Sequence, residues 1–228
     1  MMTKLPRWVE VGGFLLASMA GAANAVGLLG FEHQAVSHLT GTITLLGVSL
    51  TKQTYVQAAH LVAIVLSFVL GAVAAGAIVG RVALQLGRRY GYALLLESAL
   101  LVGATAALVR GSTTGHYLAS AACGLQNGMV STYSGAVVRT THVSGLFTDL
   151  GTMLGGRVRG HPINRRQAGL YLLLIAGFLL GGVAGALLFD RIGFRALLLP
   201  AAGALALALA YELLLRPRGT DEVALGHA

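Results

Sequence analysis

The sequence predicts an all-α integral membrane protein with about six transmembrane helices, arranged as two inverted three-helix repeats that each carry a re-entrant half-helix. Composition is the first observation behind this prediction, because 56% of the 228 residues are hydrophobic and only 11% are charged. Soluble domains carry about 25% charged residues. Long runs almost free of charge follow one another, and a polar motif of the first half recurs in the second. We therefore expect one membrane domain over residues 1–228, covered by lipid.

Six nearly charge-free runs are long enough to cross a bilayer. They cover residues 11–31, 53–80, 90–109, 111–138, 167–189 and 196–215. A helix rises about 1.5 Å per residue, so each run can span roughly 30 Å of hydrocarbon. Only Glu97 and Glu212 place a formal charge inside these runs.

The basic residues predict the orientation of the chain. With six spans, twelve of them fall on one side of the membrane, namely Lys4, Arg7, Arg81, Arg88, Arg89, Arg139, Arg157, Arg159, Arg165, Arg166, Arg216 and Arg218. Four fall on the other side, namely Lys52, Arg110, Arg191 and Arg195. Because basic loops stay in the cytoplasm, both termini are predicted to be cytoplasmic, with residues 216–228 as a tail. Two further spans, at residues 33–51 and 140–156, would change the split to ten against six, so six spans is favoured and seven or eight are the alternatives.

The two halves of the chain share the motif Gly-x-x-Asn followed by His-x-(Thr/Ser)-Gly-x-x-Thr-x-Leu-Gly. The motif occupies residues 21–24 and 38–47, and again residues 124–127 and 142–151. Matches continue at residues 68–74 with 178–184, at Arg81 with Arg191, and at Ala93 with Ala196. The offset stays between 103 and 110 residues, which indicates a duplication of the whole half. We predict internal repeats at residues 11–110 and 111–215.

Each repeat contains an odd number of spans, so the second repeat is predicted to lie upside down relative to the first. Residues 33–51 would then enter the membrane from outside, and residues 140–156 from the cytoplasm. Both segments are short and polar at their start, which is typical of re-entrant half-helices. Irregular backbone at membrane depth is tolerated only against protein or a water-filled cavity. We therefore expect the two segments to face each other near the midplane.

The paired motifs, including the later Gly-Leu-Gln-Asn and residues 139–145, resemble the YoaK-like family of uncharacterised bacterial inner-membrane proteins. The resemblance covers nearly the whole chain. It implies a six- or seven-helix protein of the bacterial inner membrane, and it supplies no substrate. Family members usually carry Asp beside the first glycines and Asn after the first Thr-Gly, where this chain has Asn24 and Thr42. The resemblance therefore implies no shared ligand chemistry at these two positions.

Two histidines occupy equivalent positions, each followed by a small hydroxyl residue and a glycine at the start of a predicted half-helix. The two sets are His38, Thr40 and Gly41, and His142, Ser144 and Gly145. The N-terminus of a helix presents unpaired N–H groups and a positive dipole end, which favour an anion or a substrate carboxylate. We predict substrate binding here. The alternative is that each histidine caps its turn and hydrogen-bonds across the repeat interface.

Three amide side chains, Asn24, Gln126 and Asn127, lie inside otherwise apolar predicted helices. Burying an unpaired amide costs about 1–3 kcal/mol, so each needs a partner. Because Asn24 and Asn127 recur at matched positions, we predict that they line the same cavity as the histidines. Hydrogen bonding between helices is the alternative.

Two carboxyl groups, those of Asp149 and Glu97, have no acidic counterpart in the other repeat, where Leu45 and Pro200 stand. An ionisable group inside a membrane span indicates a functional site, through ion coupling or a proton relay. The alternative for Asp149 is pairing with Arg139 or Arg157, and for Glu97 a position near interfacial water.

Small residues recur every four positions in the central helix of each half. The rows are Gly71, Ala75 and Val79, and Gly177, Gly181 and Gly185. Such rows let helix backbones approach closely. We expect the two central helices to cross each other or a second copy of the chain, which makes a homo-oligomer one outcome.

A transporter or channel for a small solute or ion fits these patterns best, because inverted repeats, paired polar motifs and intramembrane carboxyls together describe a site reached from both sides. A receptor or assembly factor, whose polar centre only holds the fold together, is the alternative. An enzyme is not expected, since the chain lacks HExxH, GxSxG and any compact His/Asp cluster, and neither a metal nor another cofactor is predicted. The basic residues lie in short clusters between apolar runs, which disfavours nucleic-acid binding.

Overall fold

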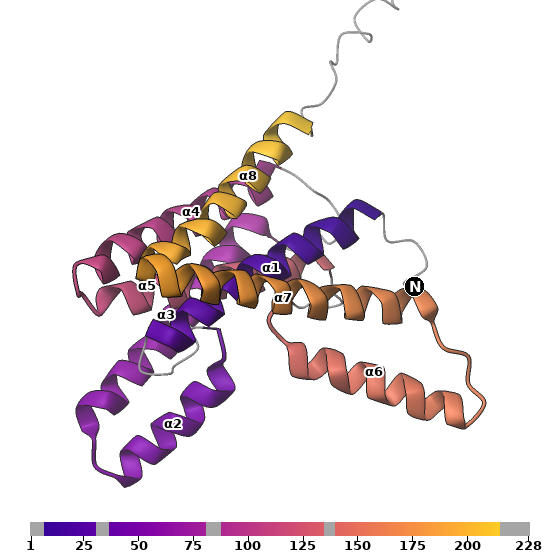
Figure 1. Ribbon diagram of the computed structural model, residues 1–228, viewed down its shortest axis with the longest axis horizontal. Coiled ribbons are helices and arrows are strands. Elements are labelled where there is room, and N and C mark those ends of the chain that lie inside the picture. Colours follow the sequence, from indigo (N-terminus) through magenta and orange to yellow (C-terminus); the bar gives the residue numbers. More distant parts are fainter. Residues whose placement is uncertain (1–6, 31–36, 81–87, 135–139, 215–228) are drawn as a thin grey trace, which may run out of the picture.

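A computed structural model describes residues 7–30, 37–80, 88–134 and 140–214 of the chain. Within these ranges the structure is helical apart from short connections, and it contains no strand. The helices are α1 (Arg7–Gly30), α2 (Leu39–Thr51), α3 (Tyr55–Val79), α4 (Arg88–Val109), α5 (Thr114–Ser134), α6 (Val143–Val158), α7 (Arg165–Ile192) and α8 (Leu198–Leu214), with the 3₁₀ segment η2 (Gly193–Leu197) between the last two (Figure 1). The predicted all-helical fold is confirmed.

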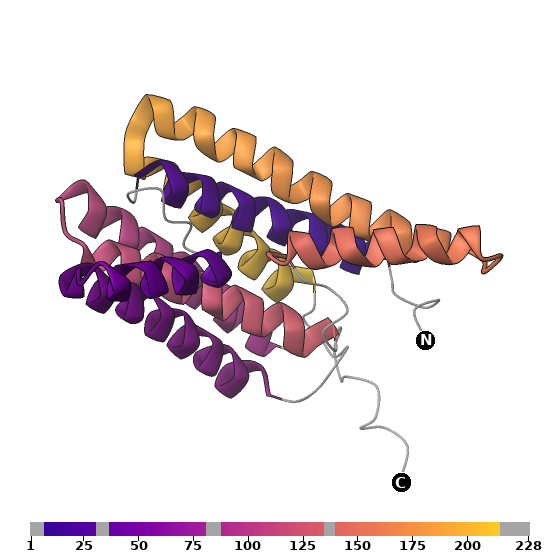
Figure 2. The ribbon, with the colours of Figure 1, turned by 90° about the horizontal axis from the view of Figure 1, so that it is seen from below.

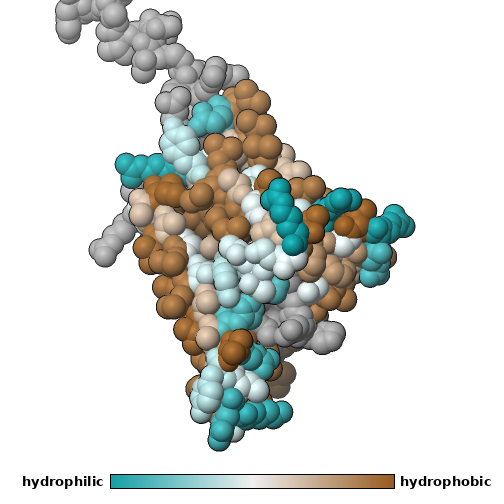
Figure 3. Space-filling view, turned by 90° about the vertical axis from the view of Figure 1, so that its left-hand side faces the viewer, coloured by the Kyte–Doolittle hydropathy of each residue, from teal (hydrophilic) through white to brown (hydrophobic). Residues whose placement is uncertain are grey.

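Four helical stretches in the described part of the chain are long and apolar enough to cross a membrane: Glu10–Gly30, Tyr55–Val79, Arg89–Val109 and Arg165–Leu213. The last one contains both α7 and α8. Many large apolar side chains along these helices are exposed, and Figure 3 shows apolar residues over much of one face, with hydrophilic ones at the lower end, at the upper left and along the right side of the view. A water-soluble protein keeps exposed apolar patches small. The distribution is that expected of a helical membrane protein.

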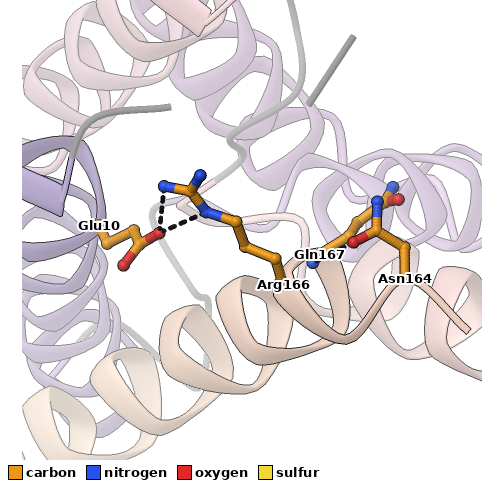
Figure 4. Close-up of polar contacts among 4 residues, drawn as sticks. All are labelled: Glu10, Asn164, Arg166 and Gln167. Atoms are coloured by element: carbon orange, nitrogen blue, oxygen red, sulfur yellow. Dashed lines mark hydrogen bonds and ion pairs between the residues drawn. The ribbon is translucent and has the colours of Figure 1, made fainter. Parts of the chain in front are cut away.

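Helices α1 and α7 start at the same end of the molecule. Near the start of α1, Glu10 accepts hydrogen bonds of 3.2 Å from Nε and Nη2 of Arg166, near the start of α7 (Figure 4). In the turn before α7, the Asn164 side chain accepts from the N–H of Gln167 at 3.2 Å and so caps the helix. The two helices therefore run in the same direction.

Glycines bring α1 and α7 into backbone contact. A methyl group added at Gly21 would overlap the carbonyl oxygen of Phe178, and one added at Gly181 would overlap the carbonyl oxygen of Ser18. Only the absence of a side chain allows this approach. The predicted close packing of the small-residue row in α7 is confirmed.

The pair α3 and α5 repeats this contact with the counterpart residues. Gly71 lies against the carbonyl of Ala121, and Gly124 lies against the carbonyl of Phe68. Farther along, Gly128 contacts Ala72 and Ala75, so α3 and α5 also run in the same direction. The expectation that the two central helices, α3 and α7, cross each other is wrong. The small-residue row of α3 faces α5, and that of α7 faces α1, so each faces the first helix of the other half.

Helices α4 and α8 connect the two pairs. α4 packs on α5 and α8, and α8 packs on α4 and α1, while Figure 2 shows the long helices lying side by side. Each of these contacts joins the end of one helix to the beginning of the other, through Gly115 with Leu108, Gly91 with Glu212, and Gly30 with Phe194 in η2. The three pairs α4–α5, α4–α8 and α1–α8 are therefore antiparallel.

The two motif helices, α2 and α6, lie on the outside of the bundle. α2 packs on α3 and α6 packs on α7, and the two project at different places on the molecule (Figure 1). Most of their side chains are exposed. The expectation that the two segments face each other is therefore wrong for the bodies of these helices. The physical reason is the short connection that follows each of them, residues 52–54 and 159–164, which folds each helix back along the next one.

Candidate functional site

A buried polar cluster lies where α4, α5 and the segment before α6 meet. Gln126 of α5 donates from Nε2 to Glu97 Oε1 of α4 at 2.9 Å, and Thr140 Oγ1 donates to Gln126 Oε1 at 3.4 Å. Glu97, Gln126 and Thr140 are 3%, 2% and 1% exposed. The predicted partnership of Gln126 is thus with a carboxyl group inside the bundle, and Glu97 lies away from the surface.

The neighbouring residue, Asn127, extends this cluster. Its Oδ1 accepts a 2.6 Å hydrogen bond from Thr141 Oγ1. The other half forms the same contact, since Asn24 Oδ1 accepts from Ser37 Oγ at 2.8 Å. In both halves the chain therefore folds back beside an asparagine within the preceding long helix before the motif helix begins.

Two polar atoms of the cluster are buried without a hydrogen-bond partner in the described part of the chain: Oε2 of Glu97 and Nδ2 of Asn127. Leaving a buried polar group unpaired costs about 1–3 kcal/mol. The cluster offers one free acceptor and one free donor. The Glu97 carboxylate can take a proton, a cation or a hydrogen-bond donor, and the Asn127 amide can donate to an acceptor such as water.

The equivalent place in the other half is apolar. Pro200 and Ala23 stand where Glu97 and Gln126 stand in the first interface, and both are buried. The helix pair α1–α8 thus packs without any polar pair. Packing alone does not require the Glu97–Gln126 contact, which favours a functional role for it.

The structure does not bring the two histidine sets into this cluster. His38 and His142 are the N-cap residues of α2 and α6 with similar backbone angles (φ −99° and −88°), and neither side chain forms a capping hydrogen bond. The exposed residues of the two sets are His38, Thr40, His142 and Ser144, whereas Gly41 and Gly145 are half-buried. Asp149 is exposed on α6 and forms no ion pair with Arg157. Arg139 lies outside the described residues.

A second polar group escaped the sequence prediction. His60 of α3 and His116 and Tyr117 of α5 lie together at the ends where both helices begin, with His60 Nδ1 2.8 Å from the Tyr117 hydroxyl and His60 Nε2 3.1 Å from His116 Nδ1. These residues belong to no repeated motif. The only sequence signal was the presence of two histidines within predicted membrane spans.

The fold and the buried polar cluster define a class, that of helical membrane proteins with a polar centre. The family model "Protein of unknown function (DUF1275)" matches residues 12–210. The chain therefore belongs to this family, which agrees with its resemblance to an uncharacterised family of membrane proteins. Neither the curated proteins nor the solved structures contain a match.

Proposed function

We propose that this protein is a small-solute transporter or channel of the bacterial inner membrane, with its site at the Glu97–Gln126–Asn127 cluster. The observation that carries the proposal is the pair of buried, unpaired polar atoms on Glu97 and Asn127. A membrane interior offers no water to compensate them. A carboxyl group buried inside a membrane bundle is typical of ion pathways and proton relays.

The directions of the helices support inverted repeats. α1 is antiparallel to α8, α8 to α4, and α4 to α5, so α1 and α5 point in opposite directions. These are the first helices of the two halves. Inverted repeats with a polar site between them are the architecture of many secondary transporters, in which the site is opened to alternate sides.

The return of the chain before each motif helix supports the proposed re-entrant segments. Ser37 and Thr141 lie beside asparagines inside α1 and α5. α2 and α6 then lead back to the ends at which α3 and α7 begin. Each motif helix covers part of the bundle length, which supports six full spans. The proposed topology has both termini in the cytoplasm.

We expect a membrane-impermeant maleimide to label a Lys52→Cys variant on intact cells, and an Arg159→Cys variant only after permeabilisation. Lys52 and Arg159 are the exposed C-cap residues of α2 and α6, which inverted repeats place on opposite sides. The natural Cys123 is buried, so the parent chain is the background control. Labelling of both variants from the same side would replace the six-span topology with eight spans in parallel repeats.

The function itself is tested by thermal unfolding of the detergent-solubilised chain against a library of metabolites and ions. A ligand at one hundred times its dissociation constant stabilises the folded state by about 2.7 kcal/mol. We expect at least one compound to raise the melting temperature of the wild type and of Glu10→Gln, but not of Glu97→Gln. Glu10 is a matched control because its carboxyl group is partly exposed in a surface ion pair, which contributes only about 0–1 kcal/mol.

Each stabilising compound is then measured as flux into proteoliposomes. The wild type and Glu10→Gln are expected to transport it at similar rates. Glu97→Gln is expected to transport it at least about tenfold more slowly, which corresponds to an increase of about 1.4 kcal/mol in the activation free energy. A compound that binds at the cluster but never crosses the bilayer would instead support a receptor. An absence of any ligand, together with a Glu97→Gln variant that unfolds much earlier, would support an assembly factor with a purely structural polar centre.

A further inference from the structure

A pocket of about 970 Å³ opens where α3 and α5 begin, away from the Glu97 cluster. Its lining consists of Gln53, Thr54, Tyr55, Val56, Gln57, Ala59, His60, Thr113, His116 and Tyr117. The described residues that line the pocket include no carboxylate. Its polar groups are imidazoles, amides and hydroxyls, so its chemistry depends on neutral donor atoms.

The two imidazole rings of the pocket hold their nitrogens at the spacing of a metal chelate. His60 Nε2 and His116 Nδ1 are 3.1 Å apart, and the rings meet edge to face at 69°. Two nitrogens bound to one tetrahedral ion at about 2.0–2.1 Å lie roughly 3.3 Å apart. The distance between the two nitrogens therefore needs to change by only a few tenths of an ångström for an ion to replace the proton that they share, once the rings turn so that both nitrogens point at the ion.

We propose that His60 and His116 form a binding site for a divalent transition-metal ion such as Cu²⁺ or Zn²⁺. Imidazole nitrogen suits these ions well. The remaining ring nitrogen of His60 lies 2.8 Å from the Tyr117 hydroxyl, and a partner at this position orients a ligating histidine and fixes its tautomer. No third His, Cys or carboxylate joins the pair among the described residues, so water completes the coordination in the open pocket.

The matching helix pair packs without a histidine pair. In the matching helix pair α7–α1, the counterparts of His60, His116 and Tyr117 are Leu170, Gly13 and Phe14. That interface is held by apolar contacts and by the glycine approaches described above. Only one of the two equivalent interfaces carries imidazoles, which indicates a role other than holding the helices together.

The surroundings also predict which cations the site selects. α3 and α5 both begin at the pocket, and the positive ends of helix dipoles oppose a cation. Without a carboxylate among the described lining residues to offset them, electrostatic attraction cannot retain a hard ion. Binding must therefore come from the imidazole nitrogens, so Cu²⁺ and Zn²⁺ bind while Mg²⁺ and Ca²⁺, which prefer oxygen ligands, do not.

The test is a Cu²⁺ titration of the detergent-solubilised full chain, prepared without a histidine tag and followed by electron paramagnetic resonance. We expect one tight ion per chain with hyperfine coupling to two nitrogens. His60→Leu, which introduces the residue of the matching interface, and His116→Ala should each weaken binding at least about tenfold. Tyr117→Phe should weaken it about 10–100-fold, as loss of an orienting partner does. His161→Ala, which changes an exposed histidine between α6 and α7, should leave binding unchanged.

Thermal unfolding without metal shows whether each variant is folded. Cu²⁺ binding that is unchanged in the folded His60→Leu variant would overturn the proposal, as would displacement of Cu²⁺ by equimolar Mg²⁺. Should a variant fail to fold, the wild-type spectrum decides, because a bound Cu²⁺ without two coupled nitrogens also excludes this site. None of these outcomes depends on transport, so the metal site and the proposed function are tested separately.

Discussion

A Gly181→Ala variant is expected to be much less stable than the wild type, whereas Gly182→Ala is expected to be nearly unaffected. The methyl group at position 181 would overlap the backbone carbonyl of Ser18, but at position 182 its nearest neighbour is the Gly21 carbonyl oxygen at 3.8 Å, an ordinary contact. Overpacking costs about 1–3 kcal/mol, and more where the surrounding atoms cannot move aside. Because the clash is with backbone, we expect the upper part of this range, measured as the free energy of unfolding in detergent.

The α3–α5 pair provides an independent version of the same comparison. Gly71→Ala should resemble Gly181→Ala, because its methyl group would overlap the Ala121 carbonyl. Gly76, on the same helix, has no atom within 4 Å of an added methyl group, so Gly76→Ala is the control. Equal stabilities of Gly71→Ala and Gly76→Ala would show that α3 and α5 do not approach through this glycine.

The second large effect is expected at the buried polar pair. Gln126→Leu removes the only donor to the Glu97 carboxyl group among the described residues and leaves Thr140 Oγ1 without its acceptor. Unpaired buried groups of this kind cost about 1–3 kcal/mol each. We therefore expect the free energy of unfolding to fall by several kcal/mol. Chemical denaturation in detergent measures this change.

The double variant Glu97→Leu with Gln126→Leu should recover most of this stability. Replacing both partners of a buried polar pair by apolar residues is often neutral, whereas removing one is costly, and the matching interface already contains Pro200 and Ala23. The double variant should nevertheless lose all ligand response. If it is as unstable as the single variant, the pair serves the fold rather than a ligand.

Most of the helices could be predicted from the sequence because each combines a long apolar run with polar ends. The Gly-x-x-x-Gly row of α7 likewise predicted a close backbone approach, since spacing alone places these glycines on one face. Its partner could not be predicted, because any helix with small residues can fill such a groove. The contact with Ser18 of α1 depends on the arrangement of all the helices.

The residues of the candidate site could be predicted from the sequence, but their contacts could not. Glu97 and Gln126 were each conspicuous as polar residues in apolar runs, but their contact joins two helices whose neighbours the sequence does not reveal. The histidine motif misled in the opposite way. His38 and His142 are matched between the halves and are exposed N-cap residues. The repeated motif therefore reflects a helix start that both halves share, and not a common site. His60 and His116 have no histidine counterparts in the other half, where Leu170 and Gly13 stand, so no repeated pattern marks them.

The pairing of α1 with α7 and of α5 with α3 has a consequence for biosynthesis. A membrane protein is inserted from its N-terminus, so α1 enters the bilayer long before α7 has been synthesised. Until then its glycine face lacks the neighbour that the finished bundle supplies. Neither half can close on itself, because each first helix has its groove in the other half. The first helix of the chain, α1, therefore reaches its final packing only after α7, in the last third of the chain, has been inserted.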